Sequence, residues 1–217
     1  MSAVTAPGRR TRERLLDVAE QLFGERGVDA VSLREIRLAA GARNAAAVQF
    51  HFENRAGLMQ ALIDRHMPAI TAIQRELFEA TIADGQGDDA RSLVAVLVRP
   101  AAVYLLRGPS ERAWVKIMSD LLQRPDLHVR EMVSSAPEIA TKVGTALYEQ
   151  LAERMPPEIA GERIVTLAQT SLHLCADRSR VEDDPSGMRA HLPGQLFVEN
   201  LVDMVCGALF APFTATP

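Results

Sequence analysis

The sequence predicts an all-α fold in which an N-terminal three-helix bundle with a helix-turn-helix precedes a larger C-terminal helical domain. Three observations support this prediction. Apolar residues recur at helical spacing along most of the 217 residues, no segment shows the alternation of a β-strand, and pairs such as Gly-Pro and Arg-Pro separate the apolar stretches. We expect the two domains to cover residues 9–53 and 54–217.

The first predicted helix covers residues 11–24. Its apolar side chains recur every three or four residues, at Leu15, Val18, Ala19, Leu22 and Phe23. Gly27 follows at a place where helices commonly end on a residue in the left-handed conformation. One face of this helix is therefore expected to pack on the helices that follow.

The second predicted helix begins at Ser32. Ser32 and Glu35 have the spacing of a capping box, in which the serine oxygen and the glutamate carboxylate each accept a backbone N–H at the start of a helix. We expect this helix to extend to about Ala40.

A short third helix is predicted after a turn at Gly41. Asn44 is a favourable N-cap residue, and residues 45–50 can form the helix before Phe52 closes the small core. A helix, a turn and a second short helix, supported by a first helix, form the arrangement that places one helix in the major groove of DNA.

A longer amphipathic segment over residues 54–82 is expected to connect the two domains, with Pro68 as a break or a kink. A loop follows at residues 84–89. Pro100 is expected either to kink the next helix or to divide it into two shorter segments. The remaining apolar stretches predict helices over 90–106, 110–123, 137–154, 158–180 and 195–210.

The net charge of −4 is distributed unevenly along the chain. Residues 1–67 carry ten arginines against eight acidic residues, whereas residues 68–217 carry fourteen basic residues against twenty acidic ones. The positive surplus therefore lies where DNA contact is expected. Four arginines, which we interpret as an arm for phosphates or as a solvated helix start, crowd the N-terminus at Arg9, Arg10, Arg12 and Arg14.

The composition argues against several other classes of protein. Cys175 and Cys206 lie in apolar, helix-patterned stretches, which suits free thiols in a reducing cytosol. The first residues lack the order of a signal peptide and no apolar run is long enough to span a bilayer, so we expect a cytoplasmic protein without a membrane partner. His173 and Cys175 point in different directions on a predicted helix, so no metal site is predicted. No catalytic or nucleotide-binding motif occurs, so neither enzyme activity nor a cofactor is expected.

Four stretches carry a resemblance to a known family: Leu22 to Gly27 (LFGERG), Val31 to Ile36 (VSLREI), Ala39 to Gly41 (AAG) and Val48 to Phe52 (VQFHF), followed by Asn54, Arg55 and Leu58. In these residues the sequence resembles the TetR family of bacterial transcriptional regulators. The resemblance covers about residues 10–65, and the remainder is similar only in length and helical character. It implies a ligand-released repressor that binds a near-palindromic, double-stranded DNA operator as a homodimer and responds to a small-molecule effector.

The resemblance also implies DNA-binding roles for residues around the turn, with a recognition helix over about 44–50. Glutamine suits an adenine edge and arginine a guanine edge. The residues that would reach base edges are Arg43, Asn44, Ala46 and Gln49. Those that would meet phosphates or pack on the sugar-phosphate backbone are Ser32, Arg34, Phe50, His51 and Arg55.

Four departures from the usual family pattern bear on these roles. The stretch between Gly41 and Phe52 is one residue longer than the usual form, so the register of the recognition helix is open by one position. The extra length falls at Arg43-Asn44. The other departures are Phe50 where some relatives have tyrosine, Arg37 in place of a small residue, and the acidic Glu53 near the DNA-facing end.

In the C-terminal domain, the resemblance implies a ligand cavity between the middle helices and a dimer interface on the last two helices. Candidate ligand contacts are Tyr104, Trp114 and Met118, with ordinary core packing as the alternative. The last predicted helix carries more apolar residues than one packed side requires. The candidate interface residues are Leu196, Phe197, Leu201 and Val205, with the chain's own core as the alternative.

Two other functions stay open on the sequence. One is a helical small-molecule-binding protein without DNA recognition, which a DNA-binding measurement would distinguish from a regulator. The other is an enzyme in the C-terminal cavity, for which the sequence offers no candidate residue.

Overall fold

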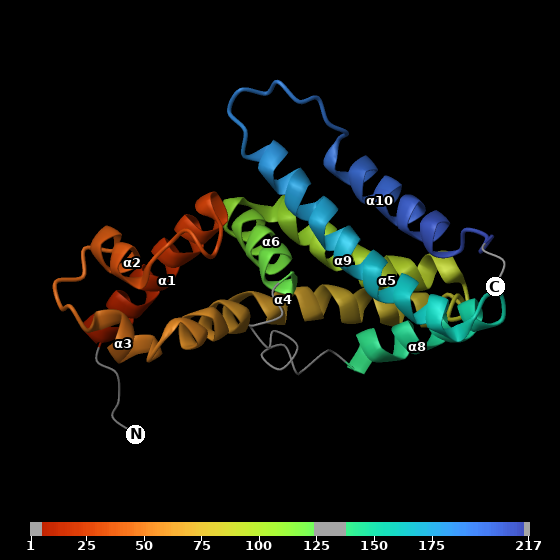
Figure 1. Cartoon of the computed structure of the whole chain (residues 1–217), viewed down its shortest axis with the longest axis horizontal. Helices are drawn as coiled ribbons and strands as arrows, with labels where there is room; N and C mark the ends of the chain where they lie inside the picture. Colours follow the sequence, from red (N-terminus) through yellow and green to blue (C-terminus); the bar gives the residue numbers. More distant parts are fainter. Residues whose placement is uncertain (1–5, 124–137, 215–217) are drawn as a thin grey trace.

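The structure is a computed structural model that describes residues 6–123 and 138–214. We call α1–α3 the head and α4–α10 the body, and Figure 1 shows the head at one end of the longer body. The predicted all-α fold, with an N-terminal helix-turn-helix and a larger helical C-terminal part, is confirmed. The elements are α1 Ala6–Arg26, α2 Leu33–Ala39, α3 Ala47–Phe52, α4 Arg55–Ala83, α5 Ala90–Tyr104, η1 Leu105–Arg107, α6 Pro109–Leu122, α8 Glu138–Ala152, α9 Pro157–Glu182 and α10 Gly194–Leu209.

The three helices of the head enclose a small apolar core together with the start of α4. Its buried side chains include Leu15, Ala19, Phe23, Ile36, Val48, Phe52, Leu58 and Leu62. These residues belong to the same continuous cluster as the core of the body, which extends to Leu209 of α10. Head and body therefore share their apolar packing at α4, and the head is not a separate globule on a linker.

Helix α4 runs without interruption from the head along the length of the body (Figure 1). Asn54 caps its start, since the Asn54 side chain accepts a hydrogen bond from Gly57 N–H at 3.0 Å. Of the two expectations for Pro68, a break or a kink, the break is wrong, because α4 continues past Pro68 to Ala83. Pro68 and Asp64 are both exposed, so the Asp64 carbonyl that Pro68 leaves without an amide partner can be hydrated by solvent.

Pro100 also lies inside a helix, but in buried surroundings. The expected division of this segment is not found, since α5 continues for four residues beyond Pro100 and then tightens into the 3-10 turn Leu105–Arg107. A proline at this position leaves the Val96 carbonyl without its helical donor. The side-chain amide of Gln74 in α4 donates to that carbonyl at 3.4 Å.

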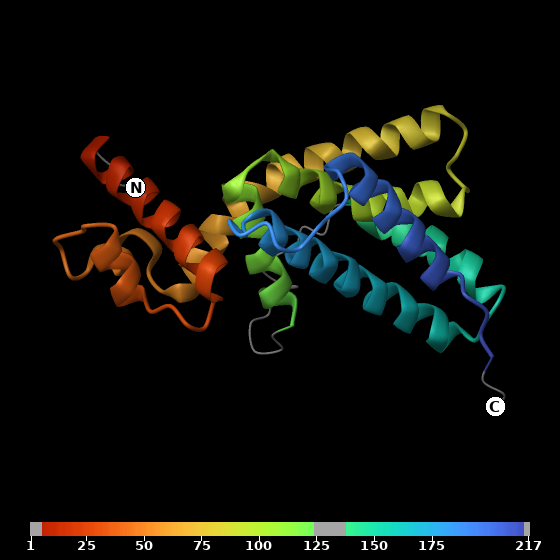
Figure 2. The ribbon, with the colours of Figure 1, turned by 90° about the horizontal axis from the view of Figure 1, so that it is seen from above.

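The body packs its helices around α5. Helices α4, α8, α9 and α10 all contact α5, and α9 also packs along α6. Figures 1 and 2 show α9 and α10 side by side on one side of the body, joined by the long connection over residues 183–193. Among the described residues, no helix is both long and apolar enough to cross a membrane.

Candidate nucleic-acid interface

The helix-turn-helix consists of α2, a turn and α3. The predicted capping box at the start of α2 is confirmed: Ser32 N–H donates to the Glu35 carboxylate at 2.8 Å, and Glu35 N–H donates to Ser32 Oγ at 3.2 Å. These hydrogen bonds lower the pKa of Glu35 to about 2. Gly41 follows with φ +64°, a conformation in which a residue with a side chain is strained.

The start of α3 differs from the prediction. The helix begins at Ala47 rather than near residue 44, and Asn44 is not its N-cap. Instead Asn44 Oδ1 accepts the Ala46 N–H at 3.0 Å, which forms a local turn before the helix begins. The extra length at Arg43-Asn44 is therefore placed in the turn.

Helix α3 has a buried face and an open face. Ala47, Val48 and Phe52 are buried in the head. Gln49 and Phe50 point outward, and Phe50 is 75% exposed. A large apolar side chain exposed to this degree beside an amide is suited to contact with another molecule rather than to stability of the chain.

The other predicted contact residues lie around this open face. Arg34, Arg43 and Ala46 are exposed, and the structure places them on α2 or in the turn. His51 is partly buried beside Phe50, with ring centroids 5.0 Å apart. Burial and the nearby charge of Arg12 lower the pKa of His51, so the neutral ring is favoured near pH 7 in the DNA-free chain.

Arg55 is placed differently from the other candidates. Its guanidinium donates to the Val31 carbonyl at 2.8 Å and to the Val28 carbonyl, and it lies over the Phe23 ring at 5.1 Å from the centroid. Arg55 thus ties the start of α4 to the segment that leads into α2. Its contact with phosphate stays a prediction, but much of its hydrogen-bonding capacity is used within the head.

A tight turn separates α3 from α4. Glu53 has φ +63° and ψ −55°, and Asn54 N–H donates to the Phe52 carbonyl at 2.6 Å, which closes a γ-turn. Gly57 packs directly under this turn, because a Cβ there would lie 2.0 Å from the Phe52 carbonyl oxygen. The strain at Glu53 fixes how α3 projects from the head.

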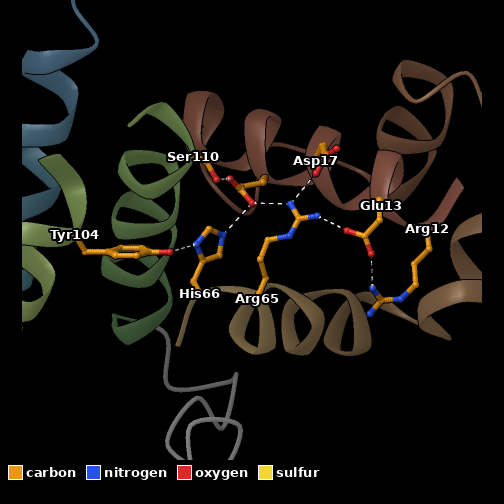
Figure 3. A network of polar contacts seen from close by, with 8 residues as sticks. Arg12, Glu13, Asp17, Arg65, His66, Tyr104 and Ser110 are labelled. Carbon is orange, nitrogen blue, oxygen red and sulfur yellow. Dashed lines mark hydrogen bonds and ion pairs between the residues drawn. The ribbon is translucent and has the colours of Figure 1, made fainter. Parts of the chain in front are cut away.

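A buried polar network joins the head to the body (Figure 3). His66 of α4 is 2% exposed and lies between two partners: Nε2 is 2.9 Å from Glu20 Oε2 of α1, and Nδ1 is 2.8 Å from Tyr104 Oη of α5. Ser110 of α6 donates to the second oxygen of Glu20. Four helices therefore meet at one carboxylate and one imidazole, and we call this network the joint.

Arg65 extends the joint along α1. Its guanidinium contacts Glu13 Oε2 and Asp17 Oδ1 at 2.8 Å and Glu20 Oε2 at 3.1 Å. Burial lowers the pKa of Arg65, but the hydrogen bonds to these acids outweigh burial and raise it above its usual value. One cation thus holds three carboxylates of α1 against α4.

The electrostatics of the joint favour a charged Glu20. Burial raises the pKa of its carboxyl, but hydrogen bonds from His66 and Ser110, together with Arg65, outweigh burial and bring the pKa below its usual value. Tyr104 behaves in the opposite way. Burial, followed by the charges of Glu111 and Glu20, raises the pKa of Tyr104 to about 12.

The joint explains where two predicted ligand contacts lie. Tyr104 bonds to His66, and Trp114, which is fully buried, stacks on the His66 ring with centroids 4.8 Å apart. Met118 is buried in the same core cluster. Tyr104 and Trp114, which the sequence suggested as ligand contacts, therefore pack on His66, a residue that the sequence analysis did not identify.

An apolar cavity of about 210 Å³ lies elsewhere in the body, between α4, α5, α8, α9 and α10. Its wall is mostly aliphatic, with two polar residues, Gln74 and Ser171. Tyr104, Trp114 and Met118 are not among its lining residues. The cavity draws its wall from five helices, so no local sequence pattern marks it.

The four predicted interface residues of α10 divide into two groups. Leu196 is 53% exposed, and Phe197 is partly buried beneath the guanidinium of Arg178, 5.0 Å from its ring centroid. Leu201 and Val205 are buried in the chain's own core, so their side chains are not part of the surface. The surface of α10 carries Met204, at 54% exposed, as a second apolar group that the prediction missed.

Within the residues that the structure covers, no three His, Cys, Asp or Glu side chains converge as metal ligands would. Cys175 is buried, which raises the pKa of its thiol to about 12, and Cys206 is partly buried. Both cysteines are free thiols.

Comparison with known proteins identifies the head. Residues 15–62 match the profile of the bacterial regulatory proteins of the tetR family. Over 65 residues the chain is 42% identical to the HTH-type transcriptional repressor BepR of Brucella suis biovar 1 (strain 1330), and the matched part is 30% of this chain. The match spans 31% of the length of that relative.

Two solved structures share the whole architecture. A tetR-family regulatory protein from Rhodococcus RHA1 aligns with a TM-score of 0.56 at 17% identity, over 92% of this chain and 97% of its own. NalD, the secondary repressor of the MexAB-OprM multidrug efflux pump in Pseudomonas aeruginosa, aligns with a TM-score of 0.55 at 23% identity, over 93% of this chain and 96% of its own. Residues 15–62 are therefore similar to the tetR family of bacterial regulatory proteins, and the chain as a whole shares the fold of these two structures.

Proposed function

We propose that this chain is a transcriptional regulator that binds double-stranded DNA through α2, the turn and α3. One observation carries the proposal: the segment that matches the tetR family, residues 15–62, includes α3, whose open face presents Gln49 and the 75% exposed Phe50. The Gln49 amide suits an adenine edge, and Phe50 and Ala46 suit apolar contact with a thymine methyl group. Arg34 and His51 would contact the sugar-phosphate backbone.

The protein would act on its operator as a homodimer. The exposed apolar residues Leu196 and Met204 on α10, beside the partly buried Phe197, support a partner surface on this side of the body. A twofold dimer presents two recognition helices about 34 Å apart, so the operator would be near-palindromic.

Ligand binding would release the DNA. The 210 Å³ cavity fits a small, mostly apolar effector, and the Gln74 amide and the Ser171 hydroxyl are the polar groups available to orient it. An effector that binds the DNA-free arrangement more tightly shifts the population toward it. Reciprocity then requires that operator DNA weakens effector binding by the same factor.

Selection of bound fragments from genomic DNA, followed by fluorescence anisotropy with an enriched fragment and a scrambled duplex, tests this function. We expect Gln49→Ala to reduce the preference for the enriched fragment, with a loss on the order of tenfold, because it removes a base contact. Gln21→Ala on α1 is the matched control, since Gln21 is exposed and bonds only to Glu25 in the described structure.

If the selection enriches no DNA fragment, the proposal is overturned. That result would favour a helical small-molecule-binding protein without DNA recognition. Equal losses for Gln49→Ala on both duplexes would overturn the role given to Gln49.

A further inference from the structure

A hollow lies at the outer end of the head, between the start of α1 and the turn that joins α2 to α3. It measures about 290 Å³, and its lining includes Arg10, Arg14 and Arg43. None of its lining residues is acidic. We call it the arginine hollow.

The three guanidinium groups are exposed, and their side chains form no hydrogen bond or ion pair with the described residues. Two other arginines of the head, by contrast, have partners: Arg26 pairs with Glu35 at 3.0 Å, and Arg37 donates to the Ala42 carbonyl at 3.0 Å. Three like charges that share one hollow repel one another, so this arrangement is stabilised when an anion enters.

The fold brings the three arginines together in two ways. Arg10 and Arg14 are four residues apart on α1 and therefore lie on the same face of that helix. The left-handed Gly41 turns the chain beside them, so closely that a Cβ at Gly41 would lie 3.4 Å from Arg14 Nη2. The acids nearest in sequence have other partners, since Glu13 contacts Arg12 and Arg65, and Asp17 contacts Arg65.

We propose that the arginine hollow binds a phosphate of the DNA backbone beside the site where α3 meets the bases. The proposal rests on the proposed function and gives Arg43 a phosphate contact in place of the base contact expected from the sequence. Guanidinium groups match phosphate oxygens with paired hydrogen bonds. Phosphate contacts position a protein on DNA without reading its sequence, so the hollow sets affinity and register.

The test measures dissociation constants over a series of KCl concentrations, for the enriched fragment and for the scrambled duplex. The variants are Arg10→Gln, Arg14→Gln and Arg43→Gln, each compared with wild type. Arg75→Gln is the matched control, because Arg75 is exposed on α4 and does not line the hollow. Thermal melts confirm that each variant is folded.

We expect each hollow variant to lower the slope of log K against log salt by about 1.8, because a dimer on DNA loses one phosphate contact in each protomer, with equal losses on both duplexes. A fourfold rise in salt would then weaken wild type about twelvefold more than the variant. Arg75→Gln should keep the wild-type slope.

Unchanged slopes in folded variants would overturn the hollow as a phosphate site while leaving DNA binding intact. A loss for Arg43→Gln confined to the enriched fragment would return Arg43 to a base contact and overturn its part in the hollow. Absence of DNA binding by wild type would overturn the proposed function itself, which is a different result from either.

Discussion

The outer end of the head and the joint use arginine in opposite ways. In the arginine hollow, Arg10, Arg14 and Arg43 lie exposed without an acidic neighbour in the lining. At the joint, a single Arg65 binds three carboxylates and takes part in a partly buried network with His66. The same side chain is a free positive charge in one place and a structural tie in the other.

This difference shows why net charge is a poor guide to the function of this chain. The acids of α1 do not pair with Arg10 or Arg14, because Asp17 and Glu20 contact Arg65, and Glu13 contacts Arg12 and Arg65. The charge that remains available to a ligand is therefore more positive than the sum over the head. Four predictions separate the two regions.

The largest effect is expected at the joint. Glu20→Ala removes a 4% exposed carboxylate that contacts His66, Arg65 and Ser110, and should lower the free energy of unfolding by about 3 kcal/mol. Urea denaturation measures this loss. Glu25→Ala, at an exposed site on the same helix, should change stability by less than about 0.5 kcal/mol. If Glu20→Ala and Glu25→Ala lower the free energy of unfolding equally, the joint contributes no more to stability than the surface of α1 does.

A pH-dependent effect should follow from Tyr104. Its pKa is raised to about 12 in the folded chain, against about 10 in the unfolded chain. The stabilisation is therefore complete below about pH 10 and is lost as the pH rises through 12, with an upper limit of about 2.7 kcal/mol. Urea denaturation of wild type and Tyr104→Phe should show stabilities that converge between these pH values. Parallel pH profiles would contradict the burial of a neutral tyrosine at the joint.

A smaller effect is expected where α1 crosses α6. A Cβ on Gly24 would lie 2.7 Å from the Cβ of Ala113, so Gly24→Ala should destabilise the chain by about 1–2 kcal/mol as the helices move apart. Gly144→Ala is the control, because Gly144 lies in α8 with no atom within 4 Å of its added Cβ. That substitution should stabilise by up to about 1 kcal/mol. Thermal unfolding measures both variants. If the two substitutions shift the unfolding temperature in the same direction, the close crossing of α1 and α6 does not restrict α1.

The smallest effect is expected in the arginine hollow. Arg14→Gln removes an exposed charge without a partner, so the free energy of unfolding should change by less than about 0.5 kcal/mol. Removal of repulsion from its neighbours favours a slight gain. A loss of more than about 1 kcal/mol in urea denaturation would mean that Arg14 has a structural role like that of Arg65.

Much of the fold could be predicted because its signals are local. The capping box at Ser32 and Glu35 lies within one helical turn, and apolar periodicity located the helices of the body. The start of α3 was missed because an asparagine that suits an N-cap can equally accept an N–H two residues on, as Asn44 does.

The joint and the cavity could not be predicted in the same way. Glu20, His66, Tyr104 and Ser110 come from four helices, and no spacing in the sequence relates them. Their aromatic side chains made Tyr104 and Trp114 candidates for ligand contact. Their common partner, His66, is a single histidine in a helix, and no motif marks it. Such contacts follow from tertiary packing, which overrides local preference.

At Pro100, a hydrogen bond from the Gln74 side chain of α4 replaces the backbone hydrogen bond that α5 lacks. This links the local stability of α5 to a residue that lines the cavity. The Gln74 amide that lines the cavity is also the donor to the Val96 carbonyl, so a guest that takes this amide for itself leaves the carbonyl unpaired. Tyr104, one turn beyond Pro100, holds His66 in the joint. An effector of the proposed kind that displaced the bond from Gln74 would loosen the turn of α5 between Pro100 and Tyr104, the residue that contacts His66 at the joint.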